Sequence, residues 1–262
     1  MTPFAVTLRS EWTKLASLRG TPIKLALAFV LSVGLTALLA LIVGATWDDA
    51  SAADRATHDP AGIGLFGSLF SMIVFAVIGA TAVTSEYGSG MIRLTLTATP
   101  RRGRVLAAKA AVIAAVTLVA GLVTATATFL VAQVVFAAYG VPTASLTDGD
   151  ALRVVLGDGG LTPVLPVIAV ALGFATRSTA GAITSVLGVV FLPWILGGVL
   201  PAWWRENALD YVPGAASEAI TSGHLESATD GLLAPGLAAL VLAAWLAAFL
   251  GAAWLALERR DA

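Results

Sequence analysis

Long apolar runs separated by short polar segments dominate the pattern of this chain. The runs cover residues 23–45, 63–84, 110–138, 161–176, 180–200 and 236–257. An α-helix rises about 1.5 Å per residue, so roughly 20 apolar residues cross the roughly 30 Å hydrocarbon core of a bilayer. Most runs reach this length. They predict an all-α integral membrane protein with six transmembrane helices, organised as a single transmembrane domain over residues 1–262.

The fourth run is short and contains Pro163 and Pro166. Because proline interrupts a helix, this run predicts either the continuation of an interfacial helix that begins near Asp150 or a span that enters the membrane tilted and kinked. The first run is longer than the apolar core of a cleaved signal peptide, so we expect it to remain as a span.

The composition agrees with a membrane protein. Apolar residues make up 58% of the chain and charged residues 12%, far from the averages of soluble domains. The absence of cysteine excludes disulfides and thiolate metal sites. The net charge is only −1, so the placement of the charges is more informative than their sum.

Basic residues lie on one side of the predicted spans. Twelve of the fifteen Lys and Arg residues precede the first span, lie between the second and third, follow the fourth or end the chain, whereas twelve of the sixteen acids occupy the other connections. Cytoplasmic loops retain Lys and Arg. We therefore expect a multi-pass protein of the plasma membrane with both termini in the cytoplasm.

Several functional classes are disfavoured by what the sequence lacks. The interiors of the predicted spans contain no Asp, Glu, Lys, Arg or His, groups that proton-coupled transporters and voltage sensors usually need. His58 and His224 lie in predicted exterior loops, without a GxSxG or HExxH pattern, which disfavours an enzyme. The sequence also lacks a GxxxxGK(S/T) phosphate loop, so we do not expect it to bind ATP in that manner.

The largest predicted cytoplasmic loop covers residues 85–104. Gly88 and Gly90 can end the second span, Ser89 can cap a new helix, and Pro100 can stop that helix before the third span. The short helix would carry apolar side chains beside arginines, as expected of a segment that inserts into a groove on a partner protein. The alternative is that it lies on anionic lipid headgroups.

Three stretches resemble one family of membrane proteins. Glu86-Tyr-Gly-Ser-Gly-Met-Ile-Arg, followed by Thr97-Ala-Thr-Pro-Arg-Arg and Lys109, resembles the loop after the second span in permeases of the type-2 ABC exporter family, especially the small permeases of actinobacteria. Glu11-Trp-Thr-Lys-Leu, continuing to Ser17-Leu-Arg, resembles the family's amphipathic amino-terminal helix. Gly173-Phe-Ala-Thr-Arg-Ser-Thr-Ala-Gly-Ala resembles its tight turn between the fourth and fifth spans. Each motif is short, so the resemblance depends on their order and position together.

The resemblance implies a permease subunit of an ATP-driven exporter. Such a subunit pairs with a second permease copy or a paralogue in a dimer, lies in membrane lipid, and binds cytoplasmic ABC ATPase subunits that hold ATP and Mg²⁺. We expect no catalytic residue, metal, cofactor or nucleic acid on this chain, which would not be an enzyme by itself. The segment from about Ser89 to Ala98 would be the coupling helix. The implied ATPase-coupling interface consists of Glu86, Tyr87, Ser89, Gly90, Met91, Ile92, Arg93, Leu94, Arg101 and Arg102.

Residues 1–22 are predicted to form a cytoplasmic amphipathic helix at the membrane surface. Its apolar stripe consists of Phe4, Leu8, Leu15 and Leu18, with Trp12 at the margin. Glu11 falls within this apolar arc. The family-based hypothesis is that it meets a basic group of the coupling loop or of the ATPase; the alternative is a frayed or slightly rotated helix. The possible interface on this helix consists of Glu11, Trp12 and Lys14.

The remaining expectations concern the substrate and the outer face. The resemblance places the dimer seam and the transport path at the second and fifth spans, where hydroxyls but no fixed charges occur, so an amphipathic or hydrophobic substrate is expected. Residues 201–235 form a long exterior segment, for which we expect short helices at the outer leaflet, including one around residues 215–220. Two other functions stay open: a passive channel or secondary carrier without an ATPase, and a non-transport component of a membrane assembly.

Overall fold

The computed structural model describes residues 4–199, 201, 203–204, 208–221 and 233–259. Within these residues the chain folds into helices and contains no strand. Six segments are long and apolar enough to cross a membrane: Gly20–Thr46, Pro60–Gly88, Arg102–Ala138, Gly149–Thr176, Thr179–Gly197 and Pro235–Arg259. The protein is therefore an all-α integral membrane protein, as the hydrophobic pattern predicts.

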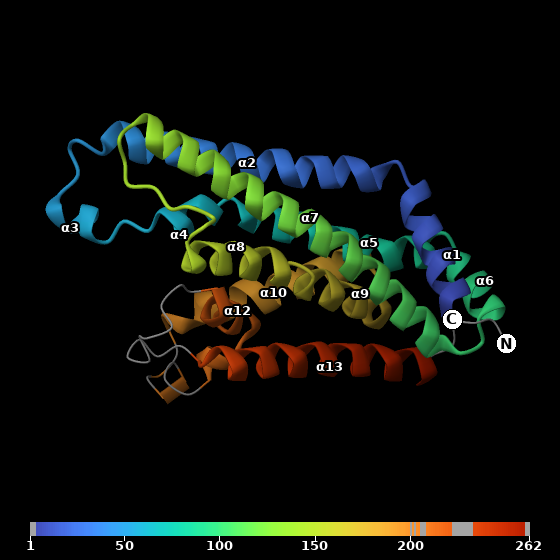
Figure 1. The fold of residues 1–262 in the computed structure, drawn as a ribbon. Coiled ribbons are helices and arrows are strands. Elements are labelled where there is room, and N and C mark those ends of the chain that lie inside the picture. Colours follow the sequence, from blue (N-terminus) through green and yellow to red (C-terminus); the bar gives the residue numbers. More distant parts are fainter. Residues whose placement is uncertain (1–3, 200, 202, 205–207, 222–232, 260–262) are drawn as a thin grey trace.

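The helices follow one another along the chain as shown in Figure 1. The first half contains α1 (Phe4–Ser17), α2 (Gly20–Thr46), α3 (Ala52–Ala56), α4 (Pro60–Leu65), α5 (Ser68–Gly88), α6 (Met91–Ala98) and α7 (Arg102–Ala138). The second half contains α8 (Gly149–Leu161), α9 (Val164–Thr176), α10 (Thr179–Gly197), the 3₁₀ turn η1 (Leu209–Tyr211), α12 (Pro213–Thr221) and α13 (Pro235–Arg259).

Helix α9 is the central helix of the bundle. It packs against α5, α7, α10 and α13, and most of its side chains are buried. A helix that is apolar on all sides is typical of such a position. Its pairing with α5 is especially close, because a Cβ added to Gly79 would lie 2.2 Å from the carbonyl oxygen of Pro166. A glycine at this position lets the two backbones approach, as is common between membrane helices.

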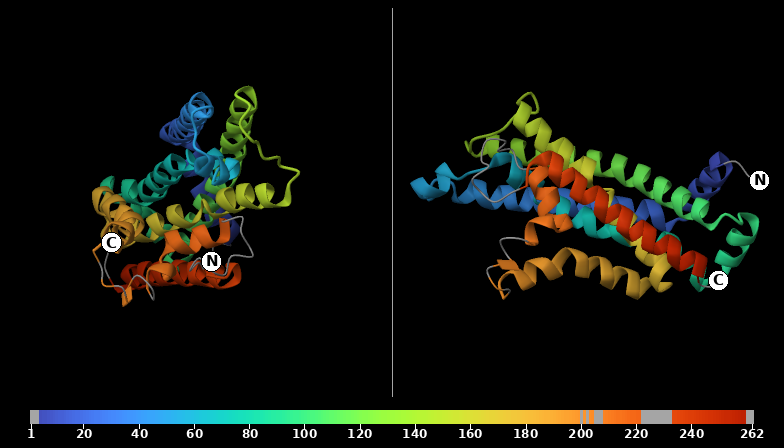
Figure 2. Two further views of the ribbon diagram at one scale, coloured as in Figure 1. Left: turned by 90° about the vertical axis from the view of Figure 1, so that its left-hand side faces the viewer. Right: turned by 90° about the horizontal axis from the view of Figure 1, so that it is seen from below.

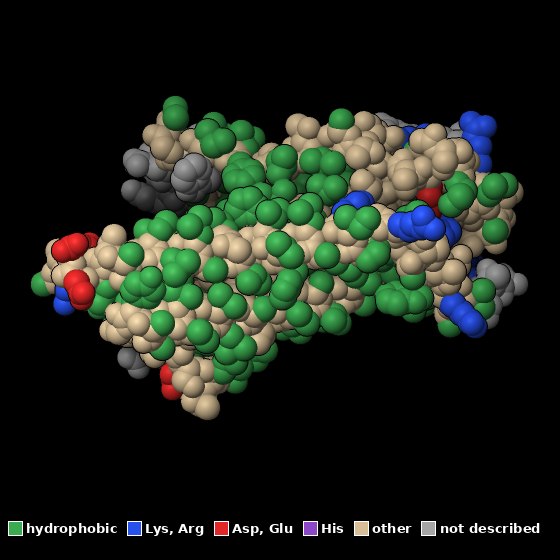
Figure 3. Space-filling view, turned by 90° about the horizontal axis from the view of Figure 1, so that it is seen from above, with side chains coloured by type: hydrophobic (Ala, Val, Ile, Leu, Met, Phe, Trp, Pro, Cys, Tyr) green, Lys and Arg blue, Asp and Glu red, His purple; other side chains and the backbone are tan. Residues whose placement is uncertain are grey.

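The two ends of the bundle differ in structure and in charge. Helices α1 and α6 and the carboxyl end of α13 lie at one end, which we call the α6 end, and α3, α4, α8 and α12 lie toward the other, which we call the α12 end (Figures 1 and 2). On the face drawn in Figure 3, most Lys and Arg side chains gather at the α6 end and most acids at the α12 end, with hydrophobic side chains between them.

The predicted interruptions occur at or near the expected residues. The fourth span is an α8–α9 pair interrupted at Thr162 and Pro163, which confirms the helix expected to begin near Asp150. The short helix of the loop begins at Met91 and not at Ser89. Ser89 does not cap it: the N-cap residue is Gly90, at φ +72°, and the Ser89 hydroxyl donates to the carbonyl of Ser85. The left-handed turn that separates the two helices is a conformation that glycine adopts readily.

The described residues between α10 and α13 include the short helices η1 and α12. Helix α12 covers the predicted 215–220 segment and packs against α13 and α8. The predicted segment 201–235 also includes residues 222–232, which lie outside the described residues, as does His224. His58 lies between the rings of Trp47 and Phe136, with centroid distances of 4.9 and 5.3 Å. This packing gives His58 a structural role.

Candidate functional site

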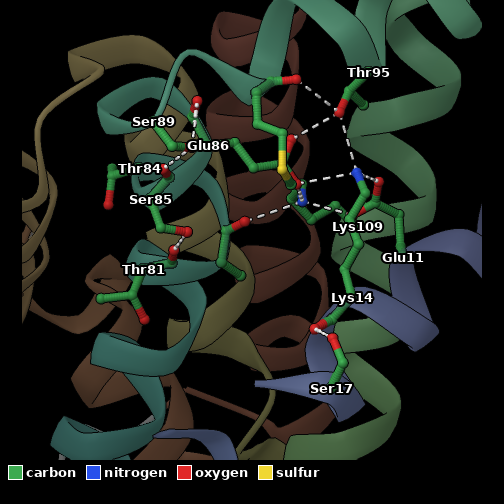
Figure 4. Close-up of polar contacts among 12 residues, drawn as sticks. Glu11, Lys14, Ser17, Thr81, Thr84, Ser85, Glu86, Ser89, Thr95 and Lys109 are labelled. Carbon is green, nitrogen blue, oxygen red and sulfur yellow. Dashed lines mark hydrogen bonds and ion pairs between the residues drawn. The ribbon is translucent and has the colours of Figure 1, made fainter. Parts of the chain in front are cut away.

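Four helices meet at the α6 end and bring five polar side chains together. Glu11 and Lys14 lie on α1, Glu86 on the last turn of α5, Thr95 on α6 and Lys109 near the start of α7. Figure 4 shows these side chains directed toward one another, joined by hydrogen bonds and ion pairs. We call Glu11, Lys14, Glu86, Thr95 and Lys109 the charge cluster. Its two carboxylates and two ammonium groups balance, so the cluster carries no formal net charge.

Lys109 is the centre of the cluster. Its Nζ lies 2.5 Å from Glu11 Oε2 and 2.7 Å from Glu86 Oε1. It also donates to the carbonyl oxygen of Ala82, at 3.0 Å. An ammonium group has three hydrogen-bond donors and no acceptor, so these three contacts satisfy it fully. Lys109 thereby joins α7 to both α1 and α5.

Lys14 and Thr95 extend the cluster to the short helix α6. Lys14 Nζ lies 2.6 Å from Glu11 Oε1 and 3.1 Å from Glu86 Oε1. It also donates to Thr95 Oγ1 at 3.2 Å, and this hydroxyl in turn donates to Glu86 Oε2 at 3.1 Å. Helix α6 is therefore bonded through one threonine to both α1 and α5.

Burial makes these ion pairs important to the fold. The side chains of Glu11, Glu86 and Lys109 are only 3%, 5% and 4% exposed, and that of Lys14 is 26% exposed. Partial burial alone would lower the pKa of Lys14, but the hydrogen bonds and charges of Glu11 and Glu86 outweigh it and raise the pKa above its ordinary value. Taking charges out of water is costly, and each buried charge here is balanced by partners.

The cluster explains the position of Glu11 within the apolar arc of the first helix. The buried face of α1 consists of Thr7, Glu11 and Leu15, which are spaced four residues apart and so lie on one side. Glu11 therefore faces the protein, where Lys109 neutralises it. The hypothesis that Glu11 meets a basic group identified the right kind of partner: Lys109, which ends the loop motif in the sequence, lies within α7 in the structure. A cavity of about 330 Å³ adjoins the cluster between α1, α5 and α7.

Helix α6 has one face that is buried against the rest of the protein and one face that is exposed. Ile92 and Leu96 are buried, and they join the main hydrophobic core. On the other face Met91 is 42% and Leu94 71% exposed, and Arg93 between them is also exposed. An exposed apolar side chain of this size beside an arginine is typical of a contact surface. We call Met91, Arg93 and Leu94 the outward face of α6.

The other residues of the predicted interface have mixed environments. The guanidinium of Arg177 lies 5.4 Å from the centre of the half-buried Tyr87 ring. Arg102 donates to the carbonyl oxygen of Leu257, which ties α7 to α13. Arg101 is exposed, and Trp12 is 52% exposed on α1. The structure thus brings Glu11, Lys14 and Glu86 together, whereas Ile92 faces the core. The assignment of the predicted set to an ATPase interface stays a prediction.

Two members of the cluster were not predicted as site residues. Lys109 directly precedes the apolar run 110–138, so the sequence places it as a flanking positive charge, but α7 begins at Arg102 and carries it inside the bundle. Thr95 had no distinguishing signal. The position of Glu11 within the apolar arc was a hint, since a carboxylate that is buried requires a cationic partner. Among the described residues, no group of three or more His, Cys, Asp or Glu side chains could hold a metal.

Comparison with known protein families matches residues 7–191 to the family described as "ABC-2 family transporter protein". The matched region runs from α1 into α10 and contains the whole charge cluster and α6. A comparison with curated proteins gave no significant match. The match covers more than half of the chain, and the six apolar helical segments agree with a membrane component. The chain belongs to the ABC-2 transporter family, as a type-2 ABC permease.

Proposed function

We propose that this permease is the membrane subunit of an ATP-driven exporter, and that a separate cytoplasmic ABC ATPase binds the outward face of α6. The ATPase holds ATP and Mg²⁺, while this chain supplies the path for an amphipathic or hydrophobic substrate across the plasma membrane. The observation that carries the proposal is the combination of an exposed apolar and basic face on α6 with a buried charge cluster behind it.

The charge cluster provides a route from the ATPase to the spans. A displacement of α6 moves Thr95, which is bonded to Glu86 at the end of α5 and to Lys14 on α1. Lys109 bonds to the same Glu86 carboxylate and so includes α7. Ile92 and Leu96 are buried in the core. A displacement of α6 by the ATPase therefore also displaces the helices that pack against these two side chains. Packed contacts and ion pairs of this kind carry coupling between sites.

The distribution of charge supports the orientation. Lys and Arg gather at the α6 end (Figure 3), and cytoplasmic segments retain these residues. The α6 end is then cytoplasmic, together with both ends of the chain, and the outward face of α6 is accessible to a soluble ATPase.

An open face on α10 supports a dimer with a second permease copy or a paralogue. Among the described side chains of α10, only Ala182 and Val186, both in its first half, are buried, and a Cβ added to Gly188 would meet no atom within 4 Å. A helix with small residues and a free side in the membrane is suited to close packing against another helix. We therefore place the second subunit against α10.

The test is copurification in detergent with the ABC ATPase encoded nearest to this chain. The variant Arg93→Glu with Leu94→Asp changes only exposed positions, so we expect it to fold and to lose the ATPase. The matched control is Arg259→Glu, a charge reversal at an exposed position on the same end of the molecule, which should retain it. Arg102 is left unchanged because its bond to Leu257 is structural.

Each outcome has a definite meaning. Loss of the ATPase in the double variant alone supports the interface on α6. If the wild type and both variants retain the ATPase, the ATPase binds a surface other than the outward face of α6. If the wild-type chain binds no ATPase, the exporter proposal is wrong and a passive carrier becomes the better explanation.

A further inference from the structure

A second cavity lies at the α12 end, far from the charge cluster. It has a volume of about 660 Å³ and is lined by residues of α4, α5, α8, α9, α10 and α12. This volume lies in the range of about 300–1,000 Å³ that is usual for small-molecule sites. We call it the outer pocket. Six helices from distant parts of the sequence form it, so its shape is a property of the whole fold.

The lining is apolar with a few converging polar groups. Leu69 and Met72 of α5, Leu165 of α9 and Val190 of α10 contribute apolar surface. Asp158 of α8 faces the same space, and Glu218 of α12 lies on its lining as an exposed residue. Binding sites for small organic molecules commonly combine apolar walls with a small number of placed polar groups.

Asp158 is held in place and lacks a cation. Ser68 Oγ donates to its Oδ1 at 3.0 Å, which fixes the carboxylate at the start of α5. No described Lys or Arg forms an ion pair with it. Arg153, on the same helix, instead donates to the carbonyl oxygen of Ile220. One hydroxyl satisfies only a small part of the hydrogen-bonding capacity of a carboxylate and none of its charge, so a positively charged ligand group would complete the site.

We propose that the outer pocket binds an amphipathic organic cation, with its apolar body against α5, α9 and α10 and its positive charge at Asp158. This inference names the substrate class of the proposed exporter and in that respect rests on the proposed function. The negative lining and the lack of a lining Lys or Arg select against anions of the same size, because the carboxylates of Asp158 and Glu218 would repel an anion.

The experiment measures binding of tetraphenylphosphonium and of tetraphenylborate, two ions of nearly the same shape and opposite charge. The full-length chain is reconstituted in phosphatidylcholine nanodiscs, and equilibrium dialysis against empty nanodiscs corrects for partition into lipid. We expect saturable binding of tetraphenylphosphonium and none of tetraphenylborate. Asp158→Asn keeps the shape and removes the charge, and should weaken tetraphenylphosphonium binding by roughly tenfold or more, as for the loss of a charged contact.

Two further variants separate charge from structure. Asp150→Asn makes the same change at an exposed position two turns earlier on α8 and should leave binding unchanged. Val190→Trp fills the pocket from α10 and should abolish binding without a change of charge. It keeps the proposal testable even if Asp158→Asn does not fold. Size-exclusion profiles of all variants report whether they are intact.

The outcomes that would overturn the proposal are specific. Equal binding of both ions, or equal weakening by Asp150→Asn and Asp158→Asn, would show that Asp158 does not select charge. Displacement of the probe by phosphatidylethanolamine in the nanodiscs, dependent on Asp158, would make the pocket a lipid headgroup site. The assay needs no ATPase, so a failure of the copurification test and a failure of this binding test are distinguished from each other.

Discussion

Substitution of Lys109 by methionine tests the charge cluster directly. Methionine is similar in length and apolar, so it fills the space but removes the ammonium group. Glu11 and Glu86, 3% and 5% exposed, then share only Lys14. Removing one partner of a buried ion pair typically costs about 3–5 kcal/mol, because the remaining charge stays buried without compensation.

That cost is large enough to measure. For a protein of this size, 1 kcal/mol shifts the unfolding temperature by about 2–4 °C, so we expect Lys109→Met to lower it by about 6–20 °C. Intrinsic fluorescence from the seven tryptophans reports unfolding of the purified protein in detergent. The control is Lys24→Met: Lys24 is half-buried in a span, whereas Lys109 is buried, and it donates only to Thr81 Oγ1, at 2.8 Å, with no described carboxylate partner.

A double-mutant cycle separates the ion pair from simple loss of packing. Glu11→Gln removes one of the carboxylates that Lys109 neutralises, so the combined variant Glu11→Gln with Lys109→Met should be more stable than Lys109→Met alone. Neighbouring residues in one network typically show interaction energies of about 0.5–3 kcal/mol. Additive effects, or a Lys109→Met shift below about 2 °C, would refute the conclusion that the buried cluster holds these helices together.

Three further predictions follow from the same geometry. Thr95→Val keeps the shape of α6 but removes its bonds to the cluster, so ATPase copurification should persist while transport falls; transport at the wild-type rate would contradict the proposed route. Gly79→Leu should prevent the close approach to Pro166, where even a Cβ would lie 2.2 Å from the carbonyl oxygen, so this variant should aggregate during purification. Gly251→Leu, at a position where an added Cβ meets no atom within 4 Å, should remain monodisperse. The pKa of Lys14 is raised from its ordinary value of 10.5, so its stabilisation is complete below that pH and is lost as pH rises through the folded-state pKa. The difference in unfolding temperature between wild type and Lys14→Met should therefore be constant up to about pH 10 and narrow above it; a difference that narrows between pH 6 and 9 would contradict this assignment.

The sequence was sufficient for the spans, because the physical requirement for them is local. A run of about 20 apolar residues must be helical in lipid, and the six predicted runs correspond to the six helical segments. The breaks at Gly90 and at Pro163 also have local causes in backbone geometry. The family could be identified because its short motifs occur in a fixed order along the first 200 residues.

The partners of buried charges could not be predicted in the same way. Glu11 and Lys109 are 98 residues apart in the chain, and their contact depends on how α1 lies across the ends of α5 and α7. Asp158 lies on α8 beside Ser68 at the start of α5, a contact between segments 90 residues apart that the hydropathy pattern does not indicate. Such contacts are set by helix packing, which a one-dimensional pattern does not contain.

The length of α7 has a mechanical consequence. Its 37 residues span about 55 Å at about 1.5 Å per residue, compared with roughly 30 Å for the hydrocarbon core. It contains no proline, the usual cause of a sharp kink. Lys109 holds this helix near one end, and Gly121, halfway along it, touches Thr162, where α8 meets α9. Helix α7 thus crosses the membrane as one rigid helix. A tilt of α7 at the charge cluster would shift α8 and α9 through the contact at Thr162, and these two helices form part of the outer pocket.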